Sequence, residues 1–389
     1  MIKKRNKNIS KLIILNITTF LLVLFGPGTI YKFYLLTKNS LKEENKTSNS
    51  KAYYPTYEDK NLSNQIFLEF GKLKTQYRSF VGWRRNKVKF KFTNISGKYN
   101  TRKSSGESIN NSSWFFGGST MWGTGASDNQ TIPSHFHELT NKNVFNFGET
   151  GWASRQSLNQ LISLIGDGHI PNQVIFYDGA NDVNHMCRSE INQIPSHSYE
   201  ETFKNILSNN LKGREKRNDM PQDVLNFISA PYLRLNKKFN IINLAVNTNS
   251  AETYNCHIDQ NKSKAIAKHL INNWYTAYLI SKQNNSKFLG ILHPNIFTSD
   301  VKYNYFTKSE QKGLITFKKN MNAVYPEILQ EIKRACVYDK EFCKSLVDGT
   351  DWLKNEENIF IDFAHINSRG NQIIAKEIAK LNNKLNKIK

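Results

Sequence analysis

The stretch WFFGGST at residues 114–120 decides the fold. Its aromatic residues form a short apolar run without alternation, and the run stops abruptly at two glycines and a serine. A strand that is buried on both faces of a sheet loses the apolar–polar alternation and has this pattern. The stretch therefore predicts a central strand that turns sharply at its carboxyl end and presents Ser119 there.

Four further runs of this kind follow along the chain: VFNFGE (144–149), QVIFYDG (173–179), KFLGILHP (287–294) and NIFIDFAH (358–365). Helix-like stretches separate the runs, and strands that alternate with helices pair in parallel. The sequence therefore predicts an α/β fold, namely a flavodoxin-like three-layer α/β/α sandwich with a five-stranded parallel sheet. One intervening helix is expected at residues 261–283, with one buried stripe formed by Ile266, Leu270, Trp274 and Leu279.

The predicted strands place the main domain at residues 111–389. Two long segments, 183–285 and 295–355, interrupt the strand pattern, and we expect them to be insertions that form a cap, because segments of this length usually carry function or structure of their own. Residues 76–110 include the alternating stretch NKVKFKFTN and predict an accessory β-hairpin region. Residues 32–75 are polar and charged, and we expect them to form a tether.

The N-terminus combines a basic start with an uncharged apolar segment. Residues 1–11 contain five Lys and Arg, and residues 12–31 contain no charged side chain. About 20 apolar residues suffice for a helix to cross a bilayer. We therefore expect a single transmembrane helix at 12–31 after a cytoplasmic basic tail, with the rest of the chain periplasmic or extracellular. A cleaved signal peptide is the competing interpretation, but no A-x-A-like site follows the apolar run.

Charge is the most unusual feature of the composition, with 54 Lys and Arg against 32 Asp and Glu and a formal net charge of +22. Such an excess suits an anionic partner, such as nucleic acid, anionic lipid or an acidic glycan. The chain has no zinc-finger, helix-turn-helix or basic aromatic motif, so we predict no nucleic-acid partner and interpret most of the charge as solvated surface. It also lacks a C-x-x-C pair and a P-loop, and we predict neither a metal nor a cofactor.

The four cysteines all follow the expected membrane anchor. They are Cys187, Cys256, Cys336 and Cys343, and four cysteines allow three disulfide pairings. The short stretch between the last two favours a 336–343 bond together with a 187–256 bond. Four free thiols in a reducing compartment are the alternative.

Polar side chains follow the ends of the predicted strands, at the edge of a parallel sheet where ligands bind. Ser119 could be a nucleophile or an ordinary helix N-cap, and Asn181 could donate a hydrogen bond to an oxyanion or serve a turn. Asp362 and His365 are three residues apart, which lets the carboxylate fix the imidazole tautomer and leaves the second ring nitrogen free to take a proton from a serine. His293 also follows a predicted strand and is a competing base.

This set of motifs resembles the SGNH hydrolases, also called GDSL-type esterases and lipases. GGST stands at the position of the family's Gly-Asp-Ser-Leu block, NFGETGW resembles the second block, GAND matches the third, and DFAH matches the Asp-x-x-His block. Gly118 and Thr120 depart from the Asp and Leu in the family name. Gly148 and Gly151 both lie in the second block, and we favour Gly151 as the family's glycine.

The resemblance implies a role for each of these residues. Ser119 would be the nucleophile, His365 the general base, and Asp362 the residue that orients it. The oxyanion hole would consist of the backbone N–H groups of Ser119 and Gly151 and the side-chain amide of Asn181.

The function that follows is a membrane-anchored serine esterase that removes an acyl group, expected to be O-acetyl, from an exported carbohydrate or a related substrate. The resemblance covers roughly residues 110–182 and 286–380. An O-acyltransferase is the nearest alternative, because it starts from the same acyl-serine and differs in water access. A third alternative is a non-catalytic, basic module that binds a glycan or a lipid.

Overall fold

The structure is a computed structural model that describes residues 16, 50–106, 108–191, 200 and 254–387. The expected cytoplasmic tail and the first part of the expected tether lie outside the described residues. The expected transmembrane helix also lies outside them, except for Asn16. No helix among the described residues is both long enough and apolar enough to cross a membrane. Contacts divide the chain into two compact units, and the fold below is that of the unit formed by Asn49–Phe203 and Ala251–Lys389.

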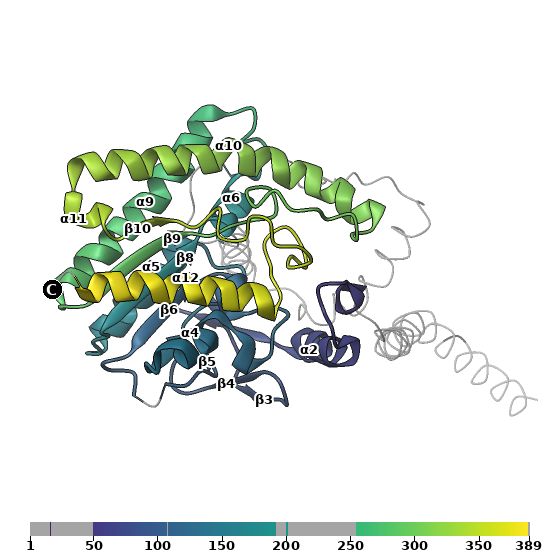
Figure 1. Cartoon of the computed structure of the whole chain (residues 1–389), viewed down its shortest axis with the longest axis horizontal. Coiled ribbons are helices and arrows are strands. Elements are labelled where there is room, and N and C mark those ends of the chain that lie inside the picture. Colours follow the sequence, from purple (N-terminus) through teal and green to yellow (C-terminus); the bar gives the residue numbers. More distant parts are fainter. Residues whose placement is uncertain (1–15, 17–49, 107, 192–199, 201–253, 388–389) are drawn as a thin grey trace, which may run out of the picture. The chain divides into compact units, whose positions relative to one another are not determined.

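A mixed sheet with eight strands among the described residues forms the centre of this unit (Figure 1). Its strand order is β10-β9-β8-β6-β7-β5-β4-β3. The parallel strands are β6 (Ser113–Gly117), β7 (Val144–Asn146), β8 (Gln173–Asp178), β9 (Lys287–Leu292) and β10 (Leu346–Asp348). The antiparallel strands that extend the sheet beyond β7 are β5 (Thr101–Arg102), β4 (Asn94–Ser96) and β3 (Val88–Lys89).

The expectation of a five-stranded parallel sheet is wrong in two respects: the sheet is mixed, because three antiparallel strands join the five parallel ones, and the last parallel strand is not the expected one. The run at 358–365 is a loop, closed by an isolated bridge between Phe360 and Ile366. Residues Ile359–Ile361 are buried, so the run has the apolar pattern of a strand without being one. β10 takes the position beside β9 instead. The segment 295–355 therefore supplies a strand of the main sheet and is not an insertion outside it.

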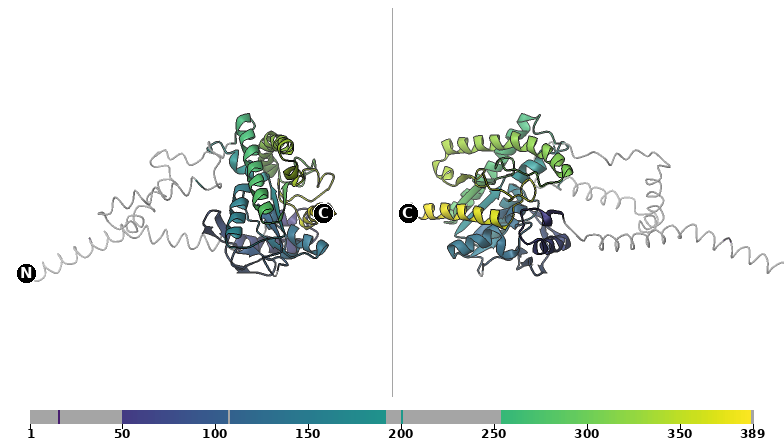
Figure 2. Two further views of the ribbon diagram at one scale, coloured as in Figure 1. Left: turned by 90° about the vertical axis from the view of Figure 1, so that its left-hand side faces the viewer. Right: turned by 45° about the vertical axis from the view of Figure 1, so that its right-hand side comes forward.

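Helices cover both faces of the sheet, as the views in Figures 1 and 2 show. On one face, Phe116 and Phe176 share a hydrophobic core with α5 (Ser154–Gly166), α9 (Gln260–Gln283) and part of α10 (Lys308–Tyr338). On the other face, Phe115 and Ile175 pack with α4 (Ile132–Thr140) and α12 (Ser368–Lys387). Successive strand residues point to opposite faces, so both faces are apolar and the strands show no alternation.

The remaining elements are short or lie at the periphery. They are η1 (Ser50–Tyr53), α2 (Lys60–Lys72), β1 (Thr75–Arg78), β2 (Gly82–Arg85), α3 (Ser119–Trp122), η2 (Asp128–Gln130), α6 (Ala180–Met186) and α11 (Lys340–Cys343). β1 and β2 form a separate two-stranded antiparallel sheet.

The buried stripe expected on α9 is correct for Ile266, Leu270 and Trp274 but wrong for Leu279, which is 45% exposed. A step of five residues from Trp274 leaves the stripe, because a helix repeats every 3.6 residues. Ala277 and Tyr278 continue the buried face in its place.

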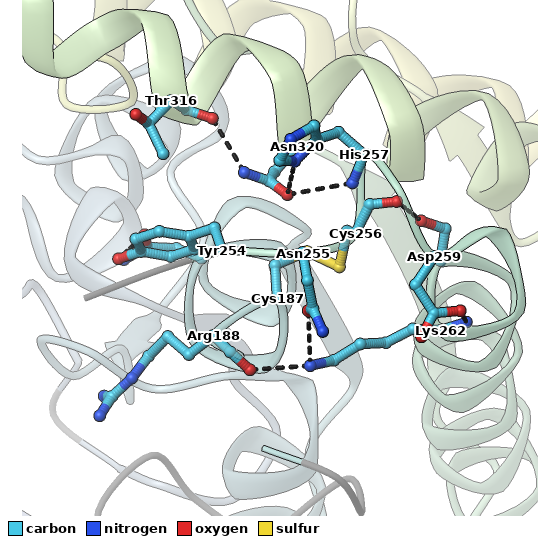
Figure 3. Close-up of a disulfide and its surroundings, with 12 residues drawn as sticks. Cys187, Arg188, Tyr254, Asn255, Cys256, His257, Asp259, Lys262, Thr316 and Asn320 are labelled. Atoms are coloured by element: carbon cyan, nitrogen blue, oxygen red, sulfur yellow. Dashed lines mark hydrogen bonds between the residues drawn. A yellow bond between two sulfur atoms is a disulfide. The ribbon is translucent and has the colours of Figure 1, made fainter. Parts of the chain in front are cut away.

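Two disulfides are present, Cys187–Cys256 and Cys336–Cys343, which is the pairing favoured from the sequence. The first joins the end of α6 to the segment that precedes α9 (Figure 3). Beside it, Lys262 Nζ donates to the carbonyl oxygen of Arg188 at 2.7 Å and to Asn255 Oδ1 at 2.9 Å. The bond therefore holds together the two ends of the segment that separates α6 from α9.

The two disulfides should differ in their contribution to stability. The Cys187–Cys256 bond spans 69 residues and the Cys336–Cys343 bond spans 7, so loop-closure entropy predicts stabilisation of about 4 and about 2 kcal/mol, respectively. Replacing both cysteines of a pair by alanine, and measuring the free energy of unfolding by denaturant titration, should show the larger loss for the 187/256 pair. An equal or larger loss for the 336/343 pair would contradict this expectation.

Candidate active site

Ser119 lies at the sharp turn between β6 and α3, as the first residue of the helix. Two glycines make this turn possible. Gly117 has φ +152°, and a Cβ there would lie 2.5 Å from the carbonyl oxygen of Tyr177 on the neighbouring strand. A Cβ on Gly118 would lie 2.3 Å from Asn181 Nδ2. Side chains at these two positions would therefore push β8 and Asn181 away from the serine.

Ser119, His365 and Asp362 form a continuous hydrogen-bonded chain. The serine Oγ lies 2.6 Å from His365 Nε2, and His365 Nδ1 lies 2.7 Å from Asp362 Oδ2 and 2.9 Å from Oδ1. Asp362 Oδ1 also accepts from the backbone N–H groups of Ala364 and His365, at 3.1 and 2.8 Å. A proton on Nδ1 is thus held by the carboxylate, which leaves Nε2 to accept the serine proton.

Asp362 has a second charged partner that sequence reasoning missed. Lys51 Nζ lies 2.7 Å from Asp362 Oδ2. Burial alone would raise the pKa of Asp362, but its interactions with His365 and Lys51 outweigh burial and hold that pKa well below its usual range. Lys51 belongs to the segment that was expected to be a tether. No spacing or motif marks it among the 54 Lys and Arg of the chain.

His293, the competing base, has both ring nitrogens engaged away from Ser119. Its Nε2 accepts from the backbone N–H of Ala180 at 3.1 Å, and its Nδ1 donates to the carbonyl oxygen of Pro294 at 2.8 Å. Burial lowers the pKa of His293 to about 4, so the ring is neutral at pH 7. The geometry gives this histidine a structural role: it fixes the first residue of α6, next to Asn181.

The oxyanion-hole candidates are only partly brought together. Asn181 lines the cavity beside Ser119, and its Nδ2 donates to the carbonyl oxygen of Trp152 at 2.7 Å. An amide carries two N–H groups, so one remains for a ligand. Gly151 lies in the turn after β7, and its carbonyl oxygen accepts from His185, but Trp152 and not Gly151 lines the cavity. The N–H of Gly148 donates to Asn146 Oδ1 at 3.0 Å, which disfavours the alternative glycine.

Two further carboxylates lie near the serine, and both are held by neighbouring donors. Asp182 accepts from the hydroxyl of Ser154 at 2.5 Å and from its N–H, and Asp178 accepts from Trp274 Nε1 at 3.1 Å. Burial raises the pKa of both carboxyl groups. The bonds of Asp182 connect the start of α6 to the start of α5, and the bond of Asp178 connects the end of β8 to α9.

The cavity beside Ser119 is small, with a volume of about 20 Å³. The residues that line it include Gly118, Ser119, Trp152, Asn181, Phe363 and His365. In the part of the chain that the structure describes, no group of three or more His, Cys, Asp or Glu is arranged to hold a metal ion.

No family model matches the chain. No curated protein matches it either. Solved structures that are similar to it include the following three. A lipolytic G-D-S-L family member from Veillonella parvula is 11% identical, with a TM-score of 0.35, and the match covers 69% of this chain and 96% of that one. A carbohydrate acetylesterase family member from Sinorhizobium meliloti is 10% identical, with a TM-score of 0.37 and coverage of 69% and 96%.

The third structure, an α/β hydrolase enzyme from the metagenome of Lake Arreo, Spain, is 12% identical, with a TM-score of 0.34 and coverage of 73% and 97%. Identities and TM-scores at this level are too low for an inference about activity. The activity of this chain has to be inferred from the side chains at its own site.

Proposed function

We propose that this protein is a serine esterase in which Ser119 is the nucleophile, His365 the general base and Asp362 the residue that orients the base. One observation carries the proposal: three side chains from distant parts of the sequence form a hydroxyl–imidazole–carboxylate chain with contacts of 2.6 and 2.7 Å. This arrangement activates a serine by removing its proton as the oxygen attacks.

In the first step, Ser119 Oγ bonds to the ester carbonyl carbon while His365 Nε2 takes the hydroxyl proton. The carbonyl oxygen becomes an oxyanion, which accepts hydrogen bonds from the backbone N–H of Ser119 and from the side-chain amide of Asn181, the two expected donors that line the cavity. The tetrahedral intermediate then breaks its bond to the alcohol, which leaves with the proton from His365. Water hydrolyses the acyl-serine in the same way and restores the enzyme.

We further propose that the acyl group is acetyl and that the alcohol is part of an exported carbohydrate. The small size of the cavity beside Ser119, about 20 Å³, supports a short acyl group over a long one. The two disulfides support an oxidising compartment, and the basic-then-apolar N-terminus supports a membrane anchor with a cytoplasmic N-terminus.

A fluorophosphonate probe, which reacts with activated serines, tests the proposal on the full chain. The expected result is labelling of the wild type. A wild type that stays inert and binds an acidic glycan in a salt-sensitive manner would instead indicate a non-catalytic module.

Incubation with an acetyl ester and an oligosaccharide separates the two reactions of an acyl-serine, because hydrolysis yields free acetate and transfer yields acetylated sugar.

Asn181→Ala should lower kcat by a factor of about 10² to 10³, because it removes a donor to the oxyanion. The matched control is Asn184→Ala, which removes the same side chain from the same helix at a position that does not line the cavity. We expect the control to stay within about threefold of the wild type. Thermal unfolding would check that both variants fold. A folded Asn181→Ala variant with wild-type kcat would refute the role of Asn181.

A further inference from the structure

The N-terminal segment reaches into the proposed catalytic centre through Lys51 in η1. Its ammonium nitrogen lies 2.7 Å from Asp362 Oδ2, and the same carboxylate oxygen lies 2.7 Å from His365 Nδ1. We propose that Lys51 is a positioning residue of the esterase, which fixes the carboxylate of Asp362 against the imidazole and sets the pH range in which that imidazole acts as a base. This inference rests on the proposed function.

Lys51 is placed by a set of packed contacts and not by a chance approach of two surface side chains. Ala52 and Phe67, from the same segment, are buried against Ile361, which directly precedes Asp362. Asn367, two residues after His365, donates through Nδ2 to the carbonyl oxygen of Thr56 at 2.6 Å. The segment 50–72 is thus fastened to the loop 359–368 at several points along its length.

Two further side chains fasten the same segment to other parts of the fold. The hydroxyl of Tyr57 donates to the carbonyl oxygen of Gly125 at 2.9 Å. Tyr54 packs against the rings of Tyr305 and Phe306 and donates to Glu310. Both contacts hold η1 close to the carboxylate that Lys51 reaches.

The contacts of the Asp362 carboxylate show what Lys51 adds. One oxygen is held by the two backbone N–H groups of its own loop, and the other by Lys51 and the imidazole. The ammonium group therefore restrains rotation of the carboxylate and keeps Oδ2 aligned with His365 Nδ1. The positive charge of Lys51 also offsets part of the negative charge of Asp362. A second positive charge, on the imidazole ring of His365, is therefore less favourable than it would be without the lysine.

Other titratable groups near this centre do not reverse the effect of Lys51 on the protonation of the imidazole. His293 is neutral because burial lowers its pKa to about 4. Burial and the charge of Asp362 raise the pKa of both Tyr57 and Tyr305 far above neutrality, so both remain uncharged. Glu310 is negative at pH 7. Asp178 and Asp182 also line the cavity, and burial raises the pKa of both carboxyl groups. None of these groups carries a positive charge, so removing Lys51 leaves only neutral and negative groups among them and favours the imidazolium form.

The test is the pH dependence of kcat/KM for p-nitrophenyl acetate, measured on the full chain together with the rate of fluorophosphonate labelling. In Lys51→Met, the midpoint of the acidic limb should move up by about 0.5 to 1 pH unit. Lys51→Arg keeps the charge, and its midpoint should stay at the wild-type value. Lys51→Gln is a second neutral variant that keeps a hydrogen-bond donor, and it should show the same upward shift.

Lys72→Met is the matched control, because it removes one positive charge from an exposed lysine of the same segment. Its midpoint should not move. An equal shift in Lys72→Met, or unshifted midpoints in both neutral Lys51 variants, would overturn the role of Lys51 while leaving a reactive wild type as an esterase. A wild type that does not react with the probe would overturn the esterase proposal and this inference with it.

Discussion

A Ser119→Ala variant is expected to lose all reaction with a fluorophosphonate probe and to show a kcat for ester hydrolysis at least about 10⁴-fold below the wild type. The hydroxyl oxygen of Ser119 is the atom that His365 Nε2 contacts, at 2.6 Å. Alanine leaves the imidazole in place but removes the oxygen that would form the acyl-enzyme. Labelling followed by mass spectrometry of the intact chain, and product release under saturating ester, are the two measurements.

Two further variants make this result specific. Ser127→Ala removes another buried serine hydroxyl, eight residues further along, which is bonded to Asn129 and Gln130 outside the cavity. It should retain full labelling. His365→Ala should lose about as much activity as Ser119→Ala, and the double variant should lose no more than either, because the two groups act as one unit. Losses that add in the double variant, or labelling that persists without Ser119, would contradict the assignment.

The first four parallel strands could be predicted from sequence because each lies in a short, nearly continuous apolar run that is followed by a turn. The same rule failed at 358–365. Ile359, Phe360 and Ile361 are buried by the helices and the N-terminal segment that surround the loop. A buried loop therefore has the same run of apolar residues in its sequence as a buried strand. β10, which takes that place in the sheet, has only partly buried or exposed residues, and its sequence carries no comparable apolar run.

The proposed catalytic residues could be identified from sequence because the carboxyl ends of parallel strands converge at one edge. Ser119 and Asn181 follow β6 and β8, and this placement needs only the strand assignment. The sequence favoured His365 over His293 because Asp362 stands three residues before it, and the hydrogen bonds agree, since Nε2 of His365 contacts Ser119 whereas Nε2 of His293 accepts from Ala180. Lys51 could not be found, since it meets Asp362 across 311 positions of sequence with no motif to connect them.

Asp362→Asn is the second substitution for which we expect a very large effect, a fall in kcat of about 10⁴-fold. The hydrogen bonds around this side chain explain why an isosteric amide fails. Every partner of the carboxylate is a hydrogen-bond donor. Oδ1 accepts from the backbone N–H groups of Ala364 and His365, and Oδ2 accepts from Lys51 Nζ. The imidazole Nδ1–H lies within hydrogen-bond distance of both oxygens. An asparagine has only one oxygen to offer them, and its NH₂ group must face donors on the other side.

The outcome depends on which side the amide oxygen takes. If it stays with the two backbone N–H groups, the NH₂ group faces Lys51 and His365 Nδ1, and the ring then carries its proton on Nε2 and cannot accept one from Ser119. If the amide turns around, two backbone donors lose their acceptor and the loop that carries His365 is destabilised. Either arrangement disables the base, so kcat should fall even where the variant folds, which thermal unfolding would verify.

Asp348→Asn makes the same acid-to-amide change at the end of β10, where the carboxylate accepts from Thr350 outside the cavity, and it should stay within about threefold of the wild type. Asp362→Asn should also differ from Lys51→Met in kind. Losing the lysine shifts the acidic limb of the pH profile, whereas losing the carboxylate abolishes the usable tautomer at every pH at which the imidazole is neutral. A folded Asp362→Asn enzyme with kcat within tenfold of the wild type would show that the imidazole is oriented without the carboxylate.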